Sequence, residues 1–290
     1  MYRSIFKSGL FDGKTVIVTG GGSGIGRCVA HELSALGALV LIVGRTQSKL
    51  DAVAAEIDAV GGKVQTYVCN IRDEDAVQNL IASIVSEHGS IHGLVNNAGG
   101  QFPSPLKQIS LKGWEAVLQT NLTGGFLMAR ECLNQTMQRG GGAIVNIVAD
   151  MWGSMPGMGH SGAARAGMVS FTETAAFEWA QYGVRVNAVA PGYVASSGMD
   201  AYPPTMAEAI RAFPRTVPLQ RFATEAEISA PVVFLLSEAA SFITGATLRV
   251  DGGRPNVRGG YPMEAAQNPP AAFDGFHLAS TPKVLQQEGD

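Results

Sequence analysis

The sequence predicts a single α/β domain over residues 1–253, doubly wound, with a seven-stranded parallel sheet and helices on both of its faces. Seven short runs are apolar almost throughout, which is typical of strands buried on both faces. Segments with helical spacing separate these runs, as they do in strand–helix–strand units. The chain has 290 residues, of which 46% are hydrophobic, so it can bury a sizeable core.

The expected strands and helix starts follow from local patterns. In chain order the strands are KTVIVT (14–19), ALVLIV (38–43), VQTYVC (64–69), IHGLVN (91–96), AIVNIV (143–148), VRVNAV (184–189) and ATLRVD (246–251). Asp73 and Ser110 each open a helix, because their side-chain oxygens can accept an N–H of the first turn. Thr224 and Glu227 form a capping box, and Pro231 is expected in or near the first turns of that helix.

Three further segments have distinctive compositions. The helix at 161–182 is apolar on nearly every side, so we expect it to be buried between subunits. The connection between 192 and 224 is long and rich in proline, which makes it a candidate substrate lid. Residues 254–290 form a C-terminal extension that packs on the surface or on a neighbouring subunit, or is partly disordered.

Composition excludes several classes of protein. Lys and Arg number 21 against 24 Asp and Glu, with a net charge of -3 and no basic cluster, so no nucleic-acid partner is expected. No segment approaches the roughly 18 apolar residues of a membrane span. The cysteines, Cys28, Cys69 and Cys132, lack metal-binding spacing and are expected to be free thiols in a reducing compartment. We therefore expect a cytoplasmic protein with no metal site and no membrane partner.

A glycine-rich turn follows the first strand and opens a helix. Its sequence is TGGGSGIG (19–26), with Gly20, Gly24 and Gly26 spaced one residue wider at the front than in the usual GxGxxG pattern. Such a turn brings the backbone close to a pyrophosphate, and the helix N-terminus offers it free N–H groups. The alternative is a flexible turn without a ligand.

Together with three later motifs, this turn resembles the short-chain dehydrogenase/reductase family over residues 12–253. The motifs are NNAG at 96–99, Asn121 within QTNLTGGF, and NAVAPGYV at 187–194. The resemblance implies a Rossmann fold, a nicotinamide cofactor and a homodimer or homotetramer. It places Asn96 and Ala98 on the adenosine side, Val194 at the carboxamide and Ser196 at the pyrophosphate. The expected cofactor-binding residues are Gly20, Ser23, Gly24, Ile25, Gly26, Arg45, Asn70, Ile71, Asn96, Ala98, Gly99, Arg165, Pro191, Gly192, Val194 and Ser196.

The end of the second strand selects the phosphate state of the cofactor. An acidic residue there would bind the ribose hydroxyls, but this chain has Gly44 followed by Arg45. A guanidinium can bind a 2′-phosphate, and no carboxylate repels it, so NADP(H) is preferred over NAD(H). Arg45 could also be an ordinary solvated residue, although that would not explain the missing acid.

The reaction site departs from the family pattern. Members normally carry a Ser after the fifth strand, a Tyr on the next helix and a Lys one turn later, whereas the matching positions here are Ala149, Ser161 and Arg165. Asn121 alone is retained. Ser161 and Arg165 still lie one turn apart on one helical face. A serine hydroxyl is a far weaker acid than a phenol, so this pair suits stabilisation of an enolate oxygen better than protonation of a ketone.

A narrower resemblance points the same way. GGQFPSP (99–105), HSGAARAG (160–167) and SFITG are similar to the peroxisomal trans-2-enoyl-CoA reductases and to bacterial citronellol/citronellal dehydrogenases. The animal reductases carry a Tyr where this chain has Val169. The leading hypothesis is therefore an NADP(H)-dependent reductase of 2-enoyl thioesters. The alternatives are an NAD(P)-dependent dehydrogenase of an acyclic terpenoid alcohol or aldehyde, and a cofactor-binding protein that has lost catalysis.

The proton donor is the least defined part of the site. Asp150 stands eleven residues before Ser161, where the related mitochondrial 2,4-dienoyl-CoA reductases carry a catalytic Tyr. If burial keeps Asp150 protonated, it could protonate the enolate; otherwise it caps a loop or pairs with a basic residue. His160, Tyr193 and Tyr202 are the remaining candidates. The expected catalytic residues are Asn121, Asp150, Ser161 and Arg165.

Overall fold

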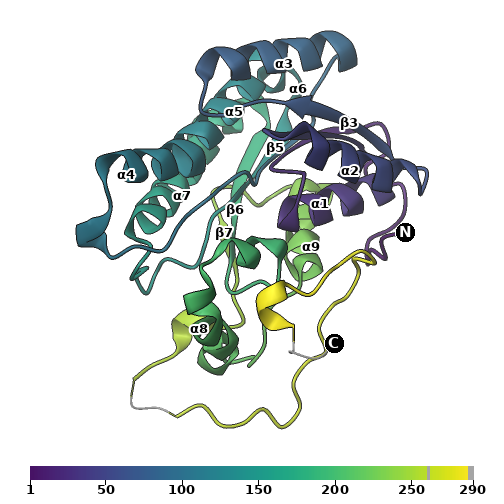
Figure 1. The fold of residues 1–290 in the computed structure, drawn as a ribbon. Coiled ribbons are helices and arrows are strands. Elements are labelled where there is room, and N and C mark those ends of the chain that lie inside the picture. The colour runs from purple at the N-terminus through teal and green to yellow at the C-terminus, as the bar shows by residue number, and fades with distance from the viewer. Residues whose placement is uncertain (260–261, 287–290) are drawn as a thin grey trace.

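A computed structural model of the chain describes residues 1–259 and 262–286. Seven parallel strands form one sheet in the order β3-β2-β1-β4-β5-β6-β7, with helices on both faces (Figure 1). The strands are β1 Thr15–Thr19, β2 Leu39–Gly44, β3 Lys63–Val68, β4 Gly93–Asn96, β5 Gly142–Ile147, β6 Val184–Pro191 and β7 Thr247–Val250. The predicted doubly wound α/β fold is confirmed, and every expected strand is present.

Each face of the sheet has its own apolar core, which explains the nearly continuous apolar runs. On β1, Val16 and Val18 face one core, whereas Ile17 between them faces the other. The first core is closed by α1 (Gly24–Ala35), α2 (Gln47–Asp58) and α9 (Glu225–Leu236). The second is closed by α3 (Glu74–His88), α5 (Gly124–Cys132) and α7 (Gly159–Trp179).

Helix starts follow the predicted capping chemistry. Asp73 accepts from the N–H of Ala76, and Ser110 accepts from the N–H of Gly113 at the start of α4 (Leu111–Leu118). The capping box at the start of α9 is also present. Pro231 lies within α9, in its second turn, as expected.

The helix that begins at Ser110 is not regular along its length. A π-helical turn at Gln119–Thr123 joins α4 to α5, and a second at Leu133–Met137 leads into α6 (Gln138–Gly140). A π turn inserts an extra residue into the helix and re-aims the side chains around it. The first of these turns carries Asn121.

The long connection after β6 and the C-terminal extension lie together. The connection, called the lid below (residues 192–224), contains short 3-10 turns and α8 (Ala207–Ala212). The extension leaves β7, passes the N-terminus and ends in a turn at Lys283–Leu285 that packs on α8 (Figure 1). Residues 260–261 and 287–290, part of the predicted extension, lie outside the described residues. No helix among the described residues is long and apolar enough to cross a membrane.

Candidate active site

The glycine-rich turn lies at the carboxyl end of β1, where its glycines are required by close packing. Gly20 has a φ of +67°, and a Cβ there would come within 2.9 Å of the Ala98 Cα. A Cβ on Gly26 would come within 2.4 Å of the Gly20 oxygen, so this glycine lets α1 pack onto the turn. Ser23, the N-cap of α1, makes no side-chain capping bond. The first N–H groups of α1 therefore suit an anionic ligand such as a pyrophosphate.

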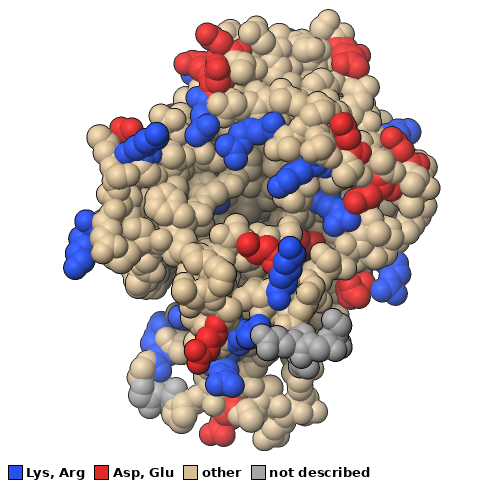
Figure 2. Space-filling view, viewed as in Figure 1, with Lys and Arg blue, Asp and Glu red and all other residues tan. Residues whose placement is uncertain are grey.

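A groove runs from this turn across the ends of β2 and β4. Three cationic side chains, Arg45, Lys49 and Arg72, line it, and Figure 2 shows a hollowed face with Lys and Arg around the hollow. The other lining residues are Gly20, Gly22, Ser23, Val43, Gly44, Thr46, Leu50, Cys69, Asn70, Ile71, Ala98, Gly99 and Thr120. The residues present fit a dinucleotide with an additional phosphate.

Two expected positions have different surroundings from those that the resemblance implied. Asn96 is buried, and its side-chain amide donates to the Gly125 oxygen and to the Asn146 Oδ1, both at 2.9 Å, so it braces the sheet against α5. Gly26 packs beneath the turn, as described above. Neither residue is among those lining the groove.

The segment after β6 meets the turn from the other side. The side chain of Ser196 comes within 4.0 Å of the place where a Gly24 Cβ would lie. Val194, 8% exposed, pairs with Ala223 in a short bridge. Gly192 lies against Asp251, whose Cα would be 2.7 Å from a Cβ on Gly192. The segment is thus held close to the glycine-rich turn at Gly24, the first residue of α1, and Ile25 is the second residue of that helix.

Asn121 and Arg165 meet at Gly99, a groove-lining residue whose position is called the inner end of the groove below. The Asn121 side chain binds the Gly100 backbone twice, accepting from its N–H at 2.8 Å and donating to its oxygen at 2.9 Å. A Cβ on Gly99 would come within 2.6 Å of the Arg165 Nη2 and 3.0 Å of the Asn121 Oδ1. Glycine at 99 therefore leaves room for the guanidinium beside the π turn.

Arg165 is a half-buried cation with hydrogen-bonding capacity to spare. Its Nη1 donates to the Ile147 oxygen at 2.7 Å, and its Nε has no partner among the described residues. Burial lowers the pKa of Arg165 to about 10, so it stays charged at neutral pH. Within the described part of the chain no carboxylate forms an ion pair with it. Such a group favours an anionic or strongly polar ligand atom.

Ser161 lies on the same face of α7, fully buried. Its hydroxyl donates to the Oε1 of Gln101 at 2.7 Å, and the Nε2 of Gln101 donates to the Tyr202 hydroxyl at 2.7 Å. The Nδ1 of His160 accepts the Ser161 N–H at 2.8 Å, and its ring meets Phe102 edge to face. This use of Nδ1 places the proton of a neutral His160 on Nε2.

Asp150 follows β5 and lies between the ends of β6 and β7. Its N–H donates to the Pro191 oxygen at 3.1 Å. Burial, followed by the nearby carboxylate of Asp251, raises the pKa of Asp150, and Arg254 and Arg249 oppose that rise. Its Oδ1 is buried and has no partner among the described residues. The ionised form of Asp150 is thus less favourable than that of a free aspartate. Its charged neighbours lie at and just after the end of β7.

Of the two lid tyrosines, the structure brings one to Ser161. Tyr193 stacks on Phe213 with ring centroids 4.2 Å apart, which fixes it within the lid. Tyr202 reaches the site through Gln101. Lys49, Arg72 and Gln101 were not predicted as site residues. Each lies close along the chain to a predicted feature: Lys49 follows Arg45, Arg72 follows Ile71, and Gln101 is part of the GGQFPSP motif.

Comparison with known proteins gives the family. A family model described as Enoyl-(Acyl carrier protein) reductase matches residues 20–254, most of the chain. The chain belongs to the short-chain dehydrogenase/reductase family. It is therefore an oxidoreductase by membership, and family members use NAD(P). The match ends where the C-terminal extension begins.

Individual short-chain dehydrogenase/reductase relatives are named for different activities. A solved structure from Pseudomonas aeruginosa PAO1, the citronellol catabolism dehydrogenase AtuB, is 58% identical, with a TM-score of 0.79 and coverage of 87% of this chain and 99% of that one. A Bacillus subtilis protein named as a probable 2,4-dienoyl-CoA reductase is 38% identical over 250 residues, which are 83% of this chain and 96% of that protein. A Beutenbergia cavernae structure described as an NAD(P)-dependent gluconate 5-dehydrogenase with bound NADP is 34% identical, with a TM-score of 0.81 and coverage of 87% and 100%.

Proposed function

We propose that the protein is an NADP(H)-dependent reductase of the 2,3 double bond of a 2-enoyl thioester. The observation that carries the proposal is the placement of Ser161 and Arg165 one turn apart on α7, where the family usually has Tyr and Lys. Ser161 is buried, and the Arg165 Nε has no partner among the described residues. Both groups donate hydrogen bonds, and neither is a good proton donor. An enolate oxygen needs such donors more than immediate protonation.

NADP(H) is supported over NAD(H) by the charge of the groove. Arg45, Lys49 and Arg72 line it, and no carboxylate ends β2. When bound, the reduced nicotinamide supplies the hydride. In our proposal the N-terminus of α1 and Ser196 hold the pyrophosphate, Val194 faces the carboxamide, and Arg165 binds the ribose as well as the reaction site.

The chain's own residues then divide the chemistry. Ser161 and Arg165 hold the thioester oxygen as negative charge develops on it. Asn121 fixes the Gly100 backbone and orders the inner end of the groove. Asp150, whose pKa burial raises, delivers a proton to the enolate directly or through a water molecule.

A second candidate is favoured by the 58% identical AtuB structure, which is a citronellol catabolism dehydrogenase by name. Under this reading the protein is an NAD(P)-dependent dehydrogenase of an acyclic terpenoid alcohol or aldehyde. Ser161 would then bind the substrate oxygen in place of the usual Tyr. For either substrate we propose a cytoplasmic homodimer or homotetramer.

Nucleotide fluorescence separates the candidates. The thioester proposal expects crotonyl-CoA to drive NADPH oxidation at least about tenfold faster than citronellol drives NADP⁺ reduction. The reverse ranking would replace it with the terpenoid proposal. Tight nucleotide binding without turnover of either substrate would contradict both and indicate a cofactor-binding protein that has lost catalysis.

A further inference from the structure

The side chain of Gln101 joins two parts of the chain that are far apart in sequence. Its Oε1 accepts from the Ser161 hydroxyl on α7, and its Nε2 donates to the Tyr202 hydroxyl in the lid, both at 2.7 Å. Ser161 is fully buried, whereas Gln101 is exposed. The amide therefore stands at the boundary between the reaction site and solvent.

The chemistry of an amide explains why this residue can make the connection. A carbonyl oxygen only accepts and an NH₂ group only donates, so one Gln can serve two hydroxyls in a fixed order. In the observed arrangement the hydroxyl proton of Ser161 is donated to the Oε1 of Gln101. A substrate oxygen that accepts this proton must take the place of Oε1.

The lid has few other ties to the reaction site near Tyr202. Residues 197–206 form short 3-10 turns, with the Tyr202 N–H donating to the Met199 oxygen at 3.2 Å. On the side away from Gln101, the Asp200 Oδ1 accepts from the Lys283 N–H of the C-terminal extension at 2.8 Å. Most of these residues are exposed. A segment with so little buried surface opens locally at a small free-energy cost, so one added hydrogen bond changes its open population measurably.

We propose that Gln101 is a positioning residue that latches the lid, through Tyr202, to the Ser161 hydroxyl. The latch consists of the two hydrogen bonds that Gln101 makes, with Ser161 and with Tyr202, in the substrate-free enzyme. The position of the lid therefore depends on what the Ser161 hydroxyl binds. A substrate oxygen that accepts the Ser161 proton releases the latch at α7, while Tyr202 stays bound to Gln101. This inference rests on the proposed function only in taking Ser161 as the hydroxyl that binds the substrate oxygen.

Hydrogen exchange of residues 197–206 in the NADPH-bound enzyme tests the latch without any substrate. Ser161→Ala, Gln101→Leu and Tyr202→Phe change three different elements, yet each breaks the same chain. Each should therefore raise exchange of this segment about fivefold, the effect of one hydrogen bond. The double variant Gln101→Leu/Tyr202→Phe should exchange no faster than either single one.

Two controls separate the latch from general loosening. Gln101→Glu should keep wild-type exchange, because a carboxylate accepts from both hydroxyls. Tyr182→Phe changes a tyrosine outside the lid and should have no effect on residues 197–206. If Ser161→Ala leaves exchange of the lid unchanged, or if the double variant shows additive effects, the latch is wrong. Lack of turnover with crotonyl-CoA would contradict the proposed function and leave this result standing.

Discussion

Arg45 is the residue whose charge most directly favours one cofactor. It lies in the groove with Lys49 and Arg72, just after β2. We expect NADPH to bind at least about tenfold more tightly than NADH, an increment of about 1.4 kcal/mol that one charged hydrogen bond can supply. Fluorescence titration measures the dissociation constants of NADPH and NADH.

Arg45→Ala should remove most of the preference for NADPH. Arg139→Ala, a change at an exposed arginine on α6, should keep it. Equal affinities in the wild type would show that this end of β2 does not select the phosphate.

Asp150 is predicted to be the proton donor because its pKa is raised by burial. Asp150→Asn should lower turnover at least about a hundredfold with NADPH binding intact, whereas Ser161→Ala should cost about tenfold. Since the protonated form acts, the wild-type rate should fall as pH rises through the raised pKa. Steady-state kinetics across pH measure both effects. Full turnover by Asp150→Asn would contradict its role as proton donor. The surroundings of Asp150 would then serve only its interactions with Asp251 and Arg254 at the end of β7.

Glu225 gives the fold its own pH dependence. It is the first residue of α9, it is 7% exposed, and its Oε1 lies 3.9 Å from the Cβ position of Gly24. Burial raises the pKa of Glu225 from 4.5 to about 7, and the charge of Arg27 opposes the rise. Between these values the unfolded chain loses the proton and the folded chain keeps it. The free energy of unfolding should therefore fall as pH rises from about 4.5 to about 7.

Glu225→Gln removes this titration. Above pH 7 the variant should be more stable than the wild type by on the order of 2 kcal/mol, and the difference should vanish near pH 4. Urea unfolding at several pH values measures it. Glu238→Gln, a change at an exposed glutamate of the same region, should show the same dependence of unfolding free energy on pH as the wild type. A Glu225→Gln variant whose stability follows pH as the wild type does would contradict the assignment.

At the scale of elements, the sequence predicts best what local chemistry determines. The caps Asp73, Ser110 and Thr224 lie at the observed helix starts, because each side chain bonds its own first turn. The glycine-rich turn is predictable for the same reason. The role of Gln101 is not, because its partners lie 60 and 101 residues away along the chain. No spacing rule connects a loop after β4 with both α7 and the lid.

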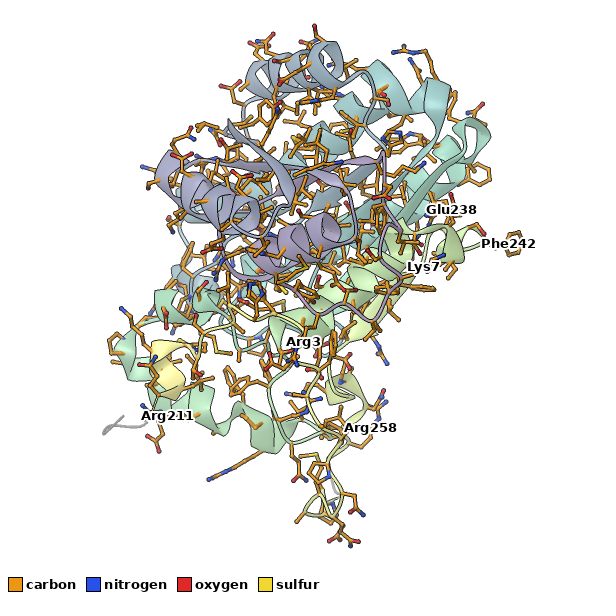
Figure 3. The ribbon with its side chains drawn as sticks, turned by 90° about the vertical axis from the view of Figure 1, so that its right-hand side faces the viewer. Arg3, Lys7, Arg211, Glu238, Phe242 and Arg258 are labelled. Carbon is orange, nitrogen blue, oxygen red and sulfur yellow. The ribbon has the colours of Figure 1, made fainter. Side chains whose placement is uncertain are left out.

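The path of the C-terminal extension was equally hidden from sequence patterns, yet it makes defined contacts with the lid. The Lys283 N–H donates to the Asp200 Oδ1, and the Arg211 Nε donates to the Val284 oxygen, both at 2.8 Å. Figure 3 shows Arg211 beside the last turn of the extension. The extension thus straps the outer side of the lid.

We expect the strap to restrict opening of α8. Arg211→Ala removes a charged hydrogen bond and should raise hydrogen exchange of residues 207–212 about fivefold or more. Arg215→Ala is the matched control, because Arg215 is an exposed arginine of the same lid whose side chain makes no hydrogen bond among the described residues. Equal exchange rates of residues 207–212 in both variants would mean that the extension contacts the lid but does not restrict the opening of α8.

At the scale of the whole molecule, the helices outside the sheet leave large apolar side chains in solvent. On α7 the buried residues follow one face, but Phe177 on the other side is 86% exposed, and Phe126 on the nearby α5 is 36% exposed. Phe242, beyond α9, is fully exposed and projects from the surface of the molecule (Figure 3). Isolated exposed apolar residues are ordinary, but a helix this apolar suggests a subunit interface.

The last prediction is that α7 packs against its symmetry mate in a homodimer or homotetramer. A Phe buried at such an interface contributes enough apolar contact that a charge in its place separates the subunits. Phe177→Asp should therefore lower the mass measured by light scattering at micromolar concentration by a factor of two or more. Nucleotide binding, which uses the carboxyl ends of the strands and the N-terminal half of α7, should persist and show that the variant is folded. Phe242→Asp supplies the comparison: if it dissociates the oligomer and Phe177→Asp does not, the interface lies at the α9 edge. A monomeric wild type would mean that the apolar surface of α7 is exposed in the working protein, and its composition would then need an explanation other than assembly.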